Sequence, residues 1–269
     1  MKLRFPTAAL EGKLLKCEAG NHSWTVGEVS PRLSNNQHSY KPKYQHFKMT
    51  ITEFAVLNLA ATPLTDEAKA ALTKAQAVQD DWHRKFFPNS PLSTSKRASA
   101  WLQQVEDPSL IVTIAQWDTV RAHLDWVASD TNKTVVAELG GDCIDATKGF
   151  DVFHADADFL SDGVSGSLVE NSVISVSRLY VPSEKKEAFT TKFDQVKHVL
   201  ETYVSPGVAR FGWREDLEEG AKEQEFVLAC SWDSVEKHYA FAEAPGFDQF
   251  SQIQQFVVRS DIKHYRRFI

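Results

Sequence analysis

Hydrophobic positions along the chain follow two patterns, short apolar runs and longer stripes at helical spacing. Strands are expected where apolar runs occur and around two tryptophans, at residues 49–60, 97–106, 110–115, 150–159, 172–181, 209–219, 225–230 and 261–268. Two stripes, each placed on one face of a helix, consist of Leu72, Ala75, Val78, Trp82 and Phe86 and of Phe189, Phe193, Val196, Leu200 and Tyr203. The pattern predicts a chain that mixes strands and helices.

Polar residues mark the starts of the predicted helices. Thr65 and Ser183 precede the two stripes, and acidic residues follow each of them closely. Asp118 and Asp233 precede two shorter helices. A side-chain oxygen at such a position accepts a hydrogen bond from the first turn, so we expect these four residues to act as N-caps.

One phrase occurs twice in the chain. Residues 116–123 read QWDTVRAH and residues 231–238 read SWDSVEKH. When Trp117 is aligned with Trp232, the other matching pairs are Asp118 with Asp233, His123 with His238 and Trp126 with Phe241. Upstream, the strand-like stretches around Trp101 and Trp213 match in the same way. The sequence therefore predicts an internal duplication.

Each half reads strand, helix, strand, strand, helix, strand, which is the order of a ferredoxin-like α+β unit. Both helices of such a unit pack on one face of its sheet, and the other face must be buried elsewhere. A second copy is the natural partner, so we expect two tandem repeats whose sheets form one barrel. The predicted organisation is an N-terminal extension (1–47), repeat 1 (48–160), a linker (161–171) and repeat 2 (172–269). The extension is expected to cover a pocket or to form a tail.

Composition narrows the classes of protein. The chain has 269 residues and a net charge of −6, which the short basic stretch at 258–268 does not outweigh, so we expect no nucleic-acid partner. The N-terminus has no long apolar segment, so we expect no secretory signal, no membrane span and a cytoplasmic location. The three cysteines, Cys17, Cys143 and Cys230, are far apart and predict neither a disulfide framework nor a structural metal.

The repeated phrase, a tryptophan, an acidic residue, Ser or Thr, and a histidine after a strand, resembles the dimeric α+β-barrel superfamily. This group includes the antibiotic-biosynthesis monooxygenases, related polyketide cyclases and stress-response barrels. The resemblance covers about residues 48–160 and 172–269, and implies a pocket in each half between the sheet and its helices. In the oxygenases, the substrate anion reduces oxygen directly, without flavin, metal or haem. The chain departs from the cyclase pattern, because Phe247 stands where those enzymes tend to have histidine.

Candidate chemistry rests on histidines and aromatic residues. His123 and His238 are candidate catalytic bases, because imidazole titrates near neutral pH. Residues expected to bind substrate are Trp101, Trp117, Trp213, Trp232, Trp126, Phe241, His154 and His264. For each histidine and tryptophan, core packing is the alternative. The stretch with His154, Asp156 and Asp158 has the spacing of a weak cation site, but a solvated strand end is favoured, and we expect no metal.

We therefore expect a cofactor-independent monooxygenase that acts on a small aromatic or polyketide-like molecule. One alternative is a cofactor-free cyclase, isomerase or dehydratase in the same pocket. Another is a non-catalytic ligand-binding or stress-response barrel. Because the two repeats satisfy each other's pairing, the chain is expected to be a monomeric pseudo-dimer or a homodimer. Four charged or polar residues lie in predicted strands, where they can orient a substrate if they face the barrel interior and are simply solvated if they face outward, namely Glu53, Arg178, Tyr180 and Arg210.

Overall fold

The computed structural model describes residues 50–90, 98–160 and 166–269, so the N-terminal extension and part of the linker lie outside it. Repeat 1 consists of β1 (Ile51–Asn58), α1 (Asp66–Phe86), β2 (Ser99–Gln104), β3 (Leu110–Trp117), α2 (Val120–Ala128), α3 (Asp130–Leu139) and β4 (Asp151–Ala155). Repeat 2 consists of β5 (Val173–Pro182), α4 (Lys186–Val204), β6 (Ala209–Trp213), β7 (Glu223–Trp232), α5 (Val235–Tyr239), α6 (Phe247–Phe250) and β8 (Arg259–Arg267). The predicted α+β fold of two ferredoxin-like repeats is confirmed.

The eight strands form one antiparallel sheet in the order β4-β1-β3-β2-β8-β5-β7-β6. The two repeats meet at two seams, each of which joins the last strand of one repeat to the second strand of the other. At one seam β2 pairs with β8. At the other seam, β4 meets β6 through the Ala155–Arg214 bridge and a bond from Asp156 N to Trp213 O of 2.8 Å. The sheet is therefore a nearly closed barrel.

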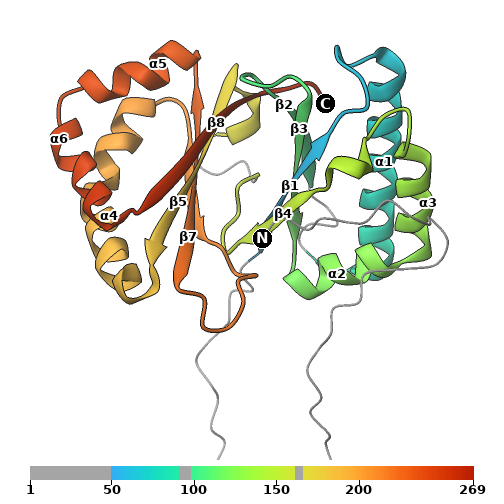
Figure 1. Cartoon of the computed structure of the whole chain (residues 1–269), viewed down its shortest axis with the longest axis horizontal. Helices are drawn as coiled ribbons and strands as arrows, with labels where there is room; N and C mark the ends of the chain where they lie inside the picture. The colour runs from blue at the N-terminus through green and yellow to red at the C-terminus, as the bar shows by residue number, and fades with distance from the viewer. Residues whose placement is uncertain (1–49, 91–97, 161–165) are drawn as a thin grey trace, which may run out of the picture. The chain divides into compact units, whose positions relative to one another are not determined.

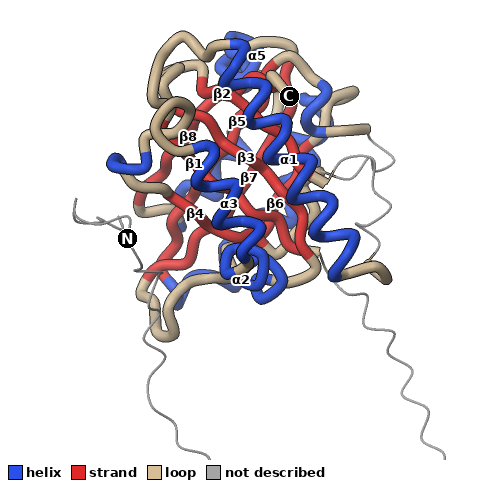
Figure 2. The backbone as a smooth tube through the Cα atoms, turned by 90° about the vertical axis from the view of Figure 1, so that its right-hand side faces the viewer, coloured by secondary structure: helices blue, strands red, loops and turns tan. Residues whose placement is uncertain are grey.

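The helices cover only the outside of this barrel. Those of repeat 1 lie on one side of the strands and those of repeat 2 on the other (Figure 1). Viewed from the side of repeat 1, α1 and α3 cross in front of the sheet (Figure 2). The strands consequently have an inner face that packs against strands of the other repeat and an outer face that packs against helices.

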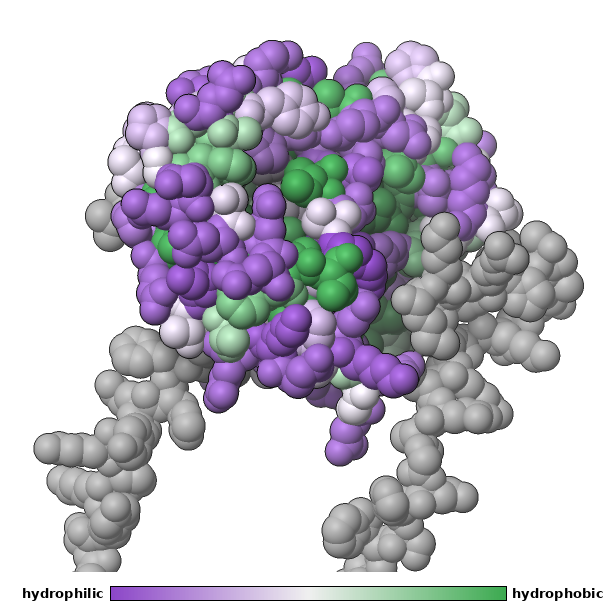
Figure 3. Space-filling model, turned by 60° about the vertical axis from the view of Figure 1, so that its left-hand side comes forward, coloured by the Kyte–Doolittle hydropathy of each residue, from purple (hydrophilic) through white to green (hydrophobic). Residues whose placement is uncertain are grey.

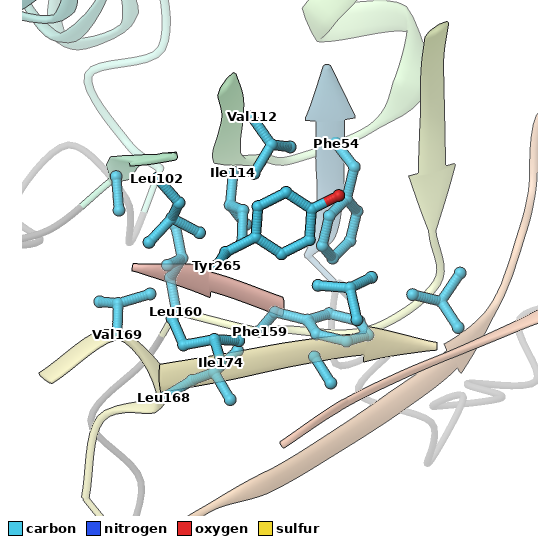
Figure 4. Packing of buried hydrophobic residues seen from close by; sticks show 14 of the residues in the cluster. Phe54, Leu102, Val112, Ile114, Phe159, Leu160, Leu168, Val169, Ile174 and Tyr265 are labelled. Carbon is cyan, nitrogen blue, oxygen red and sulfur yellow. The ribbon is translucent and has the colours of Figure 1, made fainter. Parts of the chain in front are cut away.

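The barrel interior is a single apolar cluster that draws on both repeats. Phe54 of β1 stacks on Phe153 of β4, with ring centroids 5.0 Å apart, and contacts the edge of Phe159. Figure 4 shows Phe54 and Phe159 converging with Leu160, Leu168 and other side chains of this cluster. Because both inner faces become buried at once, this core explains why one repeat needs the other.

The connection between the repeats contributes to this core. Phe159, Leu160, Leu168 and Val169 are all at most 1% exposed and belong to the interior cluster. The sequence predicted a polar linker over 161–171, of which 161–165 lie outside the described residues. In the described part, residues 167–169 are buried, and Leu168 and Val169 pack into the barrel interior.

Three local expectations are wrong. Thr119 and Ser234, not Asp118 and Asp233, cap α2 and α5 by accepting from Ala122 N and Lys237 N. Ser183 is not a cap, because it lies in a 3-10 turn before α4 and donates its hydroxyl to the Ala221 carbonyl.

The stripe of α1 also ends earlier than predicted. Leu72, Ala75 and Trp82 are buried, but Phe86 is exposed at the end of the helix. The helix α3 was not predicted at all, since its Asp130–Leu139 segment is mostly exposed and lacks a strong apolar stripe.

The described residues contain neither a membrane-spanning helix nor a disulfide. None of their helices has the length and apolar character needed to cross a bilayer. Cys143 and Cys230 are buried as free thiols, and burial raises the pKa of both. Cys17 lies outside this part of the chain.

The buried connection predicts a specific stability effect. We expect Leu168→Ala to lower the free energy of unfolding by about 2–5 kcal/mol, because it removes apolar contacts from a fully packed site and leaves a cavity. The matched control is Leu124→Ala on α2, where the side chain is 50% exposed, and its expected cost is below about 1 kcal/mol. Urea denaturation measures both, and equal effects would show that the connection is not part of the core.

Candidate active site

The candidate site in repeat 1 is built around a pair of histidines on the outer face of the sheet. His123 lies in the first turn of α2, and His154 lies on β4. Their rings meet through Nδ1 of His123 and Nε2 of His154, which are 2.7 Å apart, and both side chains are buried. The sequence singled out both residues, and the fold brings them into direct contact.

A carboxylate from the other repeat completes this pair. Asp216, which follows β6, lies 3.0 Å from Nδ1 of His154 through one oxygen, and its other oxygen accepts from the His154 backbone N–H at 3.4 Å. An ionised carboxylate can only accept hydrogen bonds, so it requires the proton of His154 on Nδ1. His154 Nε2 then accepts from Nδ1–H of His123.

Repeat 2 holds the same arrangement. Nδ1 of His238 on α5 lies 2.7 Å from Nε2 of His264 on β8. Glu106, from repeat 1, lies 2.6 Å from Nδ1 of His264 and accepts from its backbone N–H at 3.1 Å. Each repeat therefore carries a chain of two histidines that ends on a carboxylate of its partner repeat, and we call each of these a histidine relay.

The strand register explains why both carboxylates were missed. Trp101 pairs with Thr113, four residues before Trp117, whereas the residue four before Trp232 pairs with Phe211. The structural counterpart of Trp101 is thus Phe211, and the match with Trp213 was wrong by two residues. Once this register is used, Glu106 and Asp216 occupy equivalent positions. A repeated acid five residues after these aromatic residues was the available signal.

The two relays differ at one position of the first strand. In repeat 1, Glu53 is buried, accepts from Trp117 Nε1 at 2.7 Å and lies 3.3 Å from Nε2 of His123. In repeat 2 the equivalent position is Ser175, whose hydroxyl accepts from Trp232 Nε1 at 2.8 Å. Both tryptophans thus donate to the first strand, but only repeat 1 has a second carboxylate.

This difference changes how many protons each relay holds. Two neutral histidines carry two N–H protons, which suffice for the two contacts of the repeat 2 relay and leave Nε2 of His238 as an acceptor. In repeat 1, Glu53 adds a third contact, so a complete set of hydrogen bonds needs one more proton shared with His123. The repeat 1 relay is closed at both ends, and the repeat 2 relay ends in an acceptor on a half-buried ring.

Burial and neighbouring charge set the protonation of these groups. Burial and the nearby His264 lower the pKa of His238 to about 4, and burial also lowers the pKa of His123 although Glu53 opposes it. Burial favours the neutral acid at Glu106 and Asp216, but hydrogen bonds from His264 and from His154 and Arg214 outweigh it and lower both pKa values. Near pH 7, His238 is therefore a neutral imidazole, and Glu106 and Asp216 are ionised.

The predicted substrate-binding aromatic residues lie around the relays as packed side chains. All six residues are at most 9% exposed and contribute to the clusters between sheet and helices, namely Trp101, Trp117, Trp126, Trp213, Trp232 and Phe241. Two of them support the histidines directly, since Trp117 lies 5.0 Å from the His123 ring and Trp232 stacks on His238 at 4.6 Å. Their role in binding a substrate stays a prediction.

The weak cation pattern on β4 is divided among different partners. His154 belongs to the relay, Asp156 accepts from the Trp213 backbone N–H at 2.5 Å, and Asp158 accepts from the Gln116 amide. Within the ranges described, no three His, Cys, Asp or Glu side chains are grouped as metal ligands would be.

The repeat 1 relay continues into the barrel as a chain of ion pairs. Asp216 accepts from Arg214 Nε at 2.6 Å, and Arg214 Nη1 donates to Glu225 at 3.1 Å. Glu225 also accepts hydrogen bonds from Nε and Nη2 of Arg178, and Arg178 Nη1 donates to Asp151 at 2.5 Å. The β4–β6 seam thus connects the outer histidines to charged groups at the open end of the barrel.

Comparison with solved structures identifies the same architecture elsewhere. A candidate monooxygenase from Fusobacterium nucleatum aligns with a TM-score of 0.52 over 83% of this chain and 94% of its own, at 9% identity. An anthrone oxidase-like protein aligns with a TM-score of 0.50 over 82% and 92%, at 12% identity. Neither a protein-family model nor a curated protein matches the sequence. At these identities the likeness concerns the fold alone, a barrel built from two α+β repeats.

The buried state of His238 makes a prediction about pH. Its ring should titrate with a pKa of about 4 in the folded protein, against 6.5 in the unfolded chain. Because the unfolded state binds this proton first, the contribution to stability is complete above pH 6.5, declines as the pH falls toward 4 and is constant below that. NMR titration measures the pKa, with His238→Gln identifying the signal.

The same variant tests the effect on stability. The pH dependence of the free energy of unfolding between pH 6.5 and 4 should be less steep in His238→Gln than in the wild type, since carboxylates titrate alike in both proteins. Parallel curves, or a titration near 6.5, would contradict the relay geometry.

Proposed function

We propose that the protein is a small-molecule enzyme that uses His238 as a general base, and that its reaction is the cofactor-independent oxygenation of an aromatic or polyketide-like substrate. The observation that carries the proposal is the orientation of the repeat 2 relay. Glu106 and His264 direct the Nδ1 proton of His238 inward, which leaves Nε2 of a half-buried ring as the acceptor.

The relay supports base catalysis in two ways. A neutral imidazole whose tautomer is fixed by a hydrogen-bonded acid is ready to accept a proton, and the acid stabilises the imidazolium that forms. In repeat 2 this charge is shared through His264 with Glu106. Trp232 holds the ring by stacking, and the neighbouring Tyr239 is 63% exposed, where its hydroxyl can meet a substrate.

The chemistry follows from the acidity of the substrate. His238 takes a phenolic or enolic proton, and the resulting anion is the electron donor for dioxygen. At a CH₂ carbon conjugated to a phenol, oxygenation converts CH₂ into C=O, and the second oxygen atom leaves with the two hydrogens as water. The barrel neighbours described as a candidate monooxygenase and as anthrone oxidase-like have names of this reaction class.

Repeat 1 has a different part in this proposal. Glu53 occupies the Nε2 side of His123, and the ring is 6% exposed, so this relay is not open to a substrate. A cofactor-free cyclase or isomerase is the second candidate, favoured by the exposed Tyr239 beside His238, because a base and a phenol together deprotonate and reprotonate a carbon acid. Oxygen uptake separates the two candidates.

Activity should depend on the histidines unequally. With an anthrone-type phenol and an oxygen electrode, His238→Gln should lower kcat/KM by about 10²–10⁴, the usual contribution of a general base. His123→Gln should stay within roughly tenfold of the wild type, well short of that range. Circular dichroism checks that both variants are folded. Full activity in both would remove the histidines as bases, and turnover without oxygen uptake would favour the cyclase.

Glu106 should behave as a positioning residue. Glu106→Gln should lower kcat by roughly 10–100-fold, a part of the base contribution, while KM changes little, and Glu106→Asp should restore part of the rate. Its independent readout is the NMR signal of the His264 Nδ1 proton, which should be shifted far downfield in the wild type and lost in Glu106→Gln. An unchanged signal would show that the carboxylate does not orient the relay.

A further inference from the structure

A cavity lies at the open end of the barrel, where the ion-pair chain that starts at the repeat 1 relay ends. It has a volume of about 650 Å³ and lies between the barrel mouth and the β6–β7 hairpin, with Arg178, Tyr180, Arg214, Glu225 and Arg259 among its walls. A smaller recess of about 110 Å³ shares Arg178, Asp151 and Asp261 with it. It continues into the barrel between mostly apolar side chains, including Phe54, Val56, Val112 and Phe153, with Gln104 and Lys263 also in its wall. Together they form a pocket within the size range of small-molecule sites.

The two repeats line this mouth with opposite chemistry. Arg178 and Glu225 of repeat 2 occupy the positions at which repeat 1 has Val56 and Leu110. Glu225 is 2% exposed, and a buried ion pair of this kind is often no more stabilising than apolar residues of similar size. Since the apolar version is present in the same barrel, the fold does not require the charged one. This contrast indicates a role in binding.

Arg178 is placed to receive an anion. Three of its five N–H groups contact Glu225 and Asp151, and its guanidinium lies 4.1 Å above the Phe153 ring. Glu225 is buried and fixed by two arginines, whereas Asp151 is 50% exposed. Asp151 is therefore the exchangeable partner, and a ligand carboxylate can replace it on Arg178 while Glu225 stays in place.

The apolar recess determines the rest of the ligand. An apolar cavity of about 150 Å³ accommodates benzene, so the recess is on the scale of one ring that extends partly into the larger cavity. Val56, Val112 and Val176 offer branched apolar side chains against which a ring packs. A ligand with an aromatic ring at one end and a carboxylate at the other would match the recess and Arg178 together.

We propose that the barrel mouth binds a small aromatic carboxylate, with its ring in the apolar recess and its carboxylate on Arg178. This site is separate from the relay of His238, on the outer face of the sheet, and does not depend on the proposed reaction. Repeat 2 supplies the cation and repeat 1 supplies much of the apolar wall, so the intact barrel is needed.

Benzoate is the probe, and NMR titration of the full-length protein is the measurement. Benzoate should shift the methyl signals of Val56, Val112 and Val176, and the neutral analogue benzamide should bind at least tenfold more weakly. Arg178→Gln should weaken benzoate binding at least tenfold. Arg84→Gln is the matched control on α1, outside the pocket, and should leave the affinity unchanged.

Asp151→Asn gives the opposite test at a half-exposed position. Removing the competing carboxylate should tighten benzoate binding several-fold, so the proposal is testable even if Arg178→Gln does not fold. His238→Gln should bind benzoate as the wild type does, which keeps this result independent of the activity assays. Equal binding of benzoate and benzamide, methyl shifts elsewhere, or a weaker Asp151→Asn complex would overturn the proposal.

Discussion

The need to bury the second face of each half-sheet is the constraint on which the rest of this structure depends. Helices cover one face of each four-stranded half, and the other face is apolar and must be buried. Closing the two halves on each other buries Phe54, Phe153 and their neighbours, and it creates the two seams. The same closure places Glu106 and Asp216 beside the histidines of the opposite repeat. The packing that buries the core therefore also assembles the two relays.

The duplication gives two repeats with the same backbone arrangement, and different residues at a few equivalent positions give them different chemistry. Glu53 closes the histidine relay of repeat 1, whereas Ser175, at the equivalent position of repeat 2, leaves the other relay open. At the barrel mouth, repeat 1 has the apolar Val56 where repeat 2 has the charged Arg178. These exchanges occur at positions whose backbone is the same in both repeats, so they alter charge and proton content without altering topology. A duplicated barrel can therefore specialise its halves while both still support one core.

Much of the fold and part of the site followed from the sequence, for local reasons. The stripe through Phe189 and Phe193 and the apolar runs predicted helices and strands that the structure contains. The repeated phrase predicted the duplication and singled out His123 and His238. The caps of α2 and α5 were misplaced by one residue because Asp and Thr, or Asp and Ser, are adjacent and both can cap a helix. The carboxylates were missed because Trp213 seemed the counterpart of Trp101. With that alignment, which is shifted by two residues, Glu106 and Asp216 do not fall on equivalent positions.

By itself the sequence determined the repeat, its order of elements and the identity of the recurring histidines, because periodicity and spacing are properties of the chain alone. Only the tertiary structure decided which groups meet. Glu106 lies 158 residues from His264, and Asp216 lies 62 residues from His154. No local pattern relates residues so far apart, since their contact arises from strand pairing across the seams. The same pairing decided that Arg178 faces the barrel interior, a choice that strand alternation leaves open until both faces have partners.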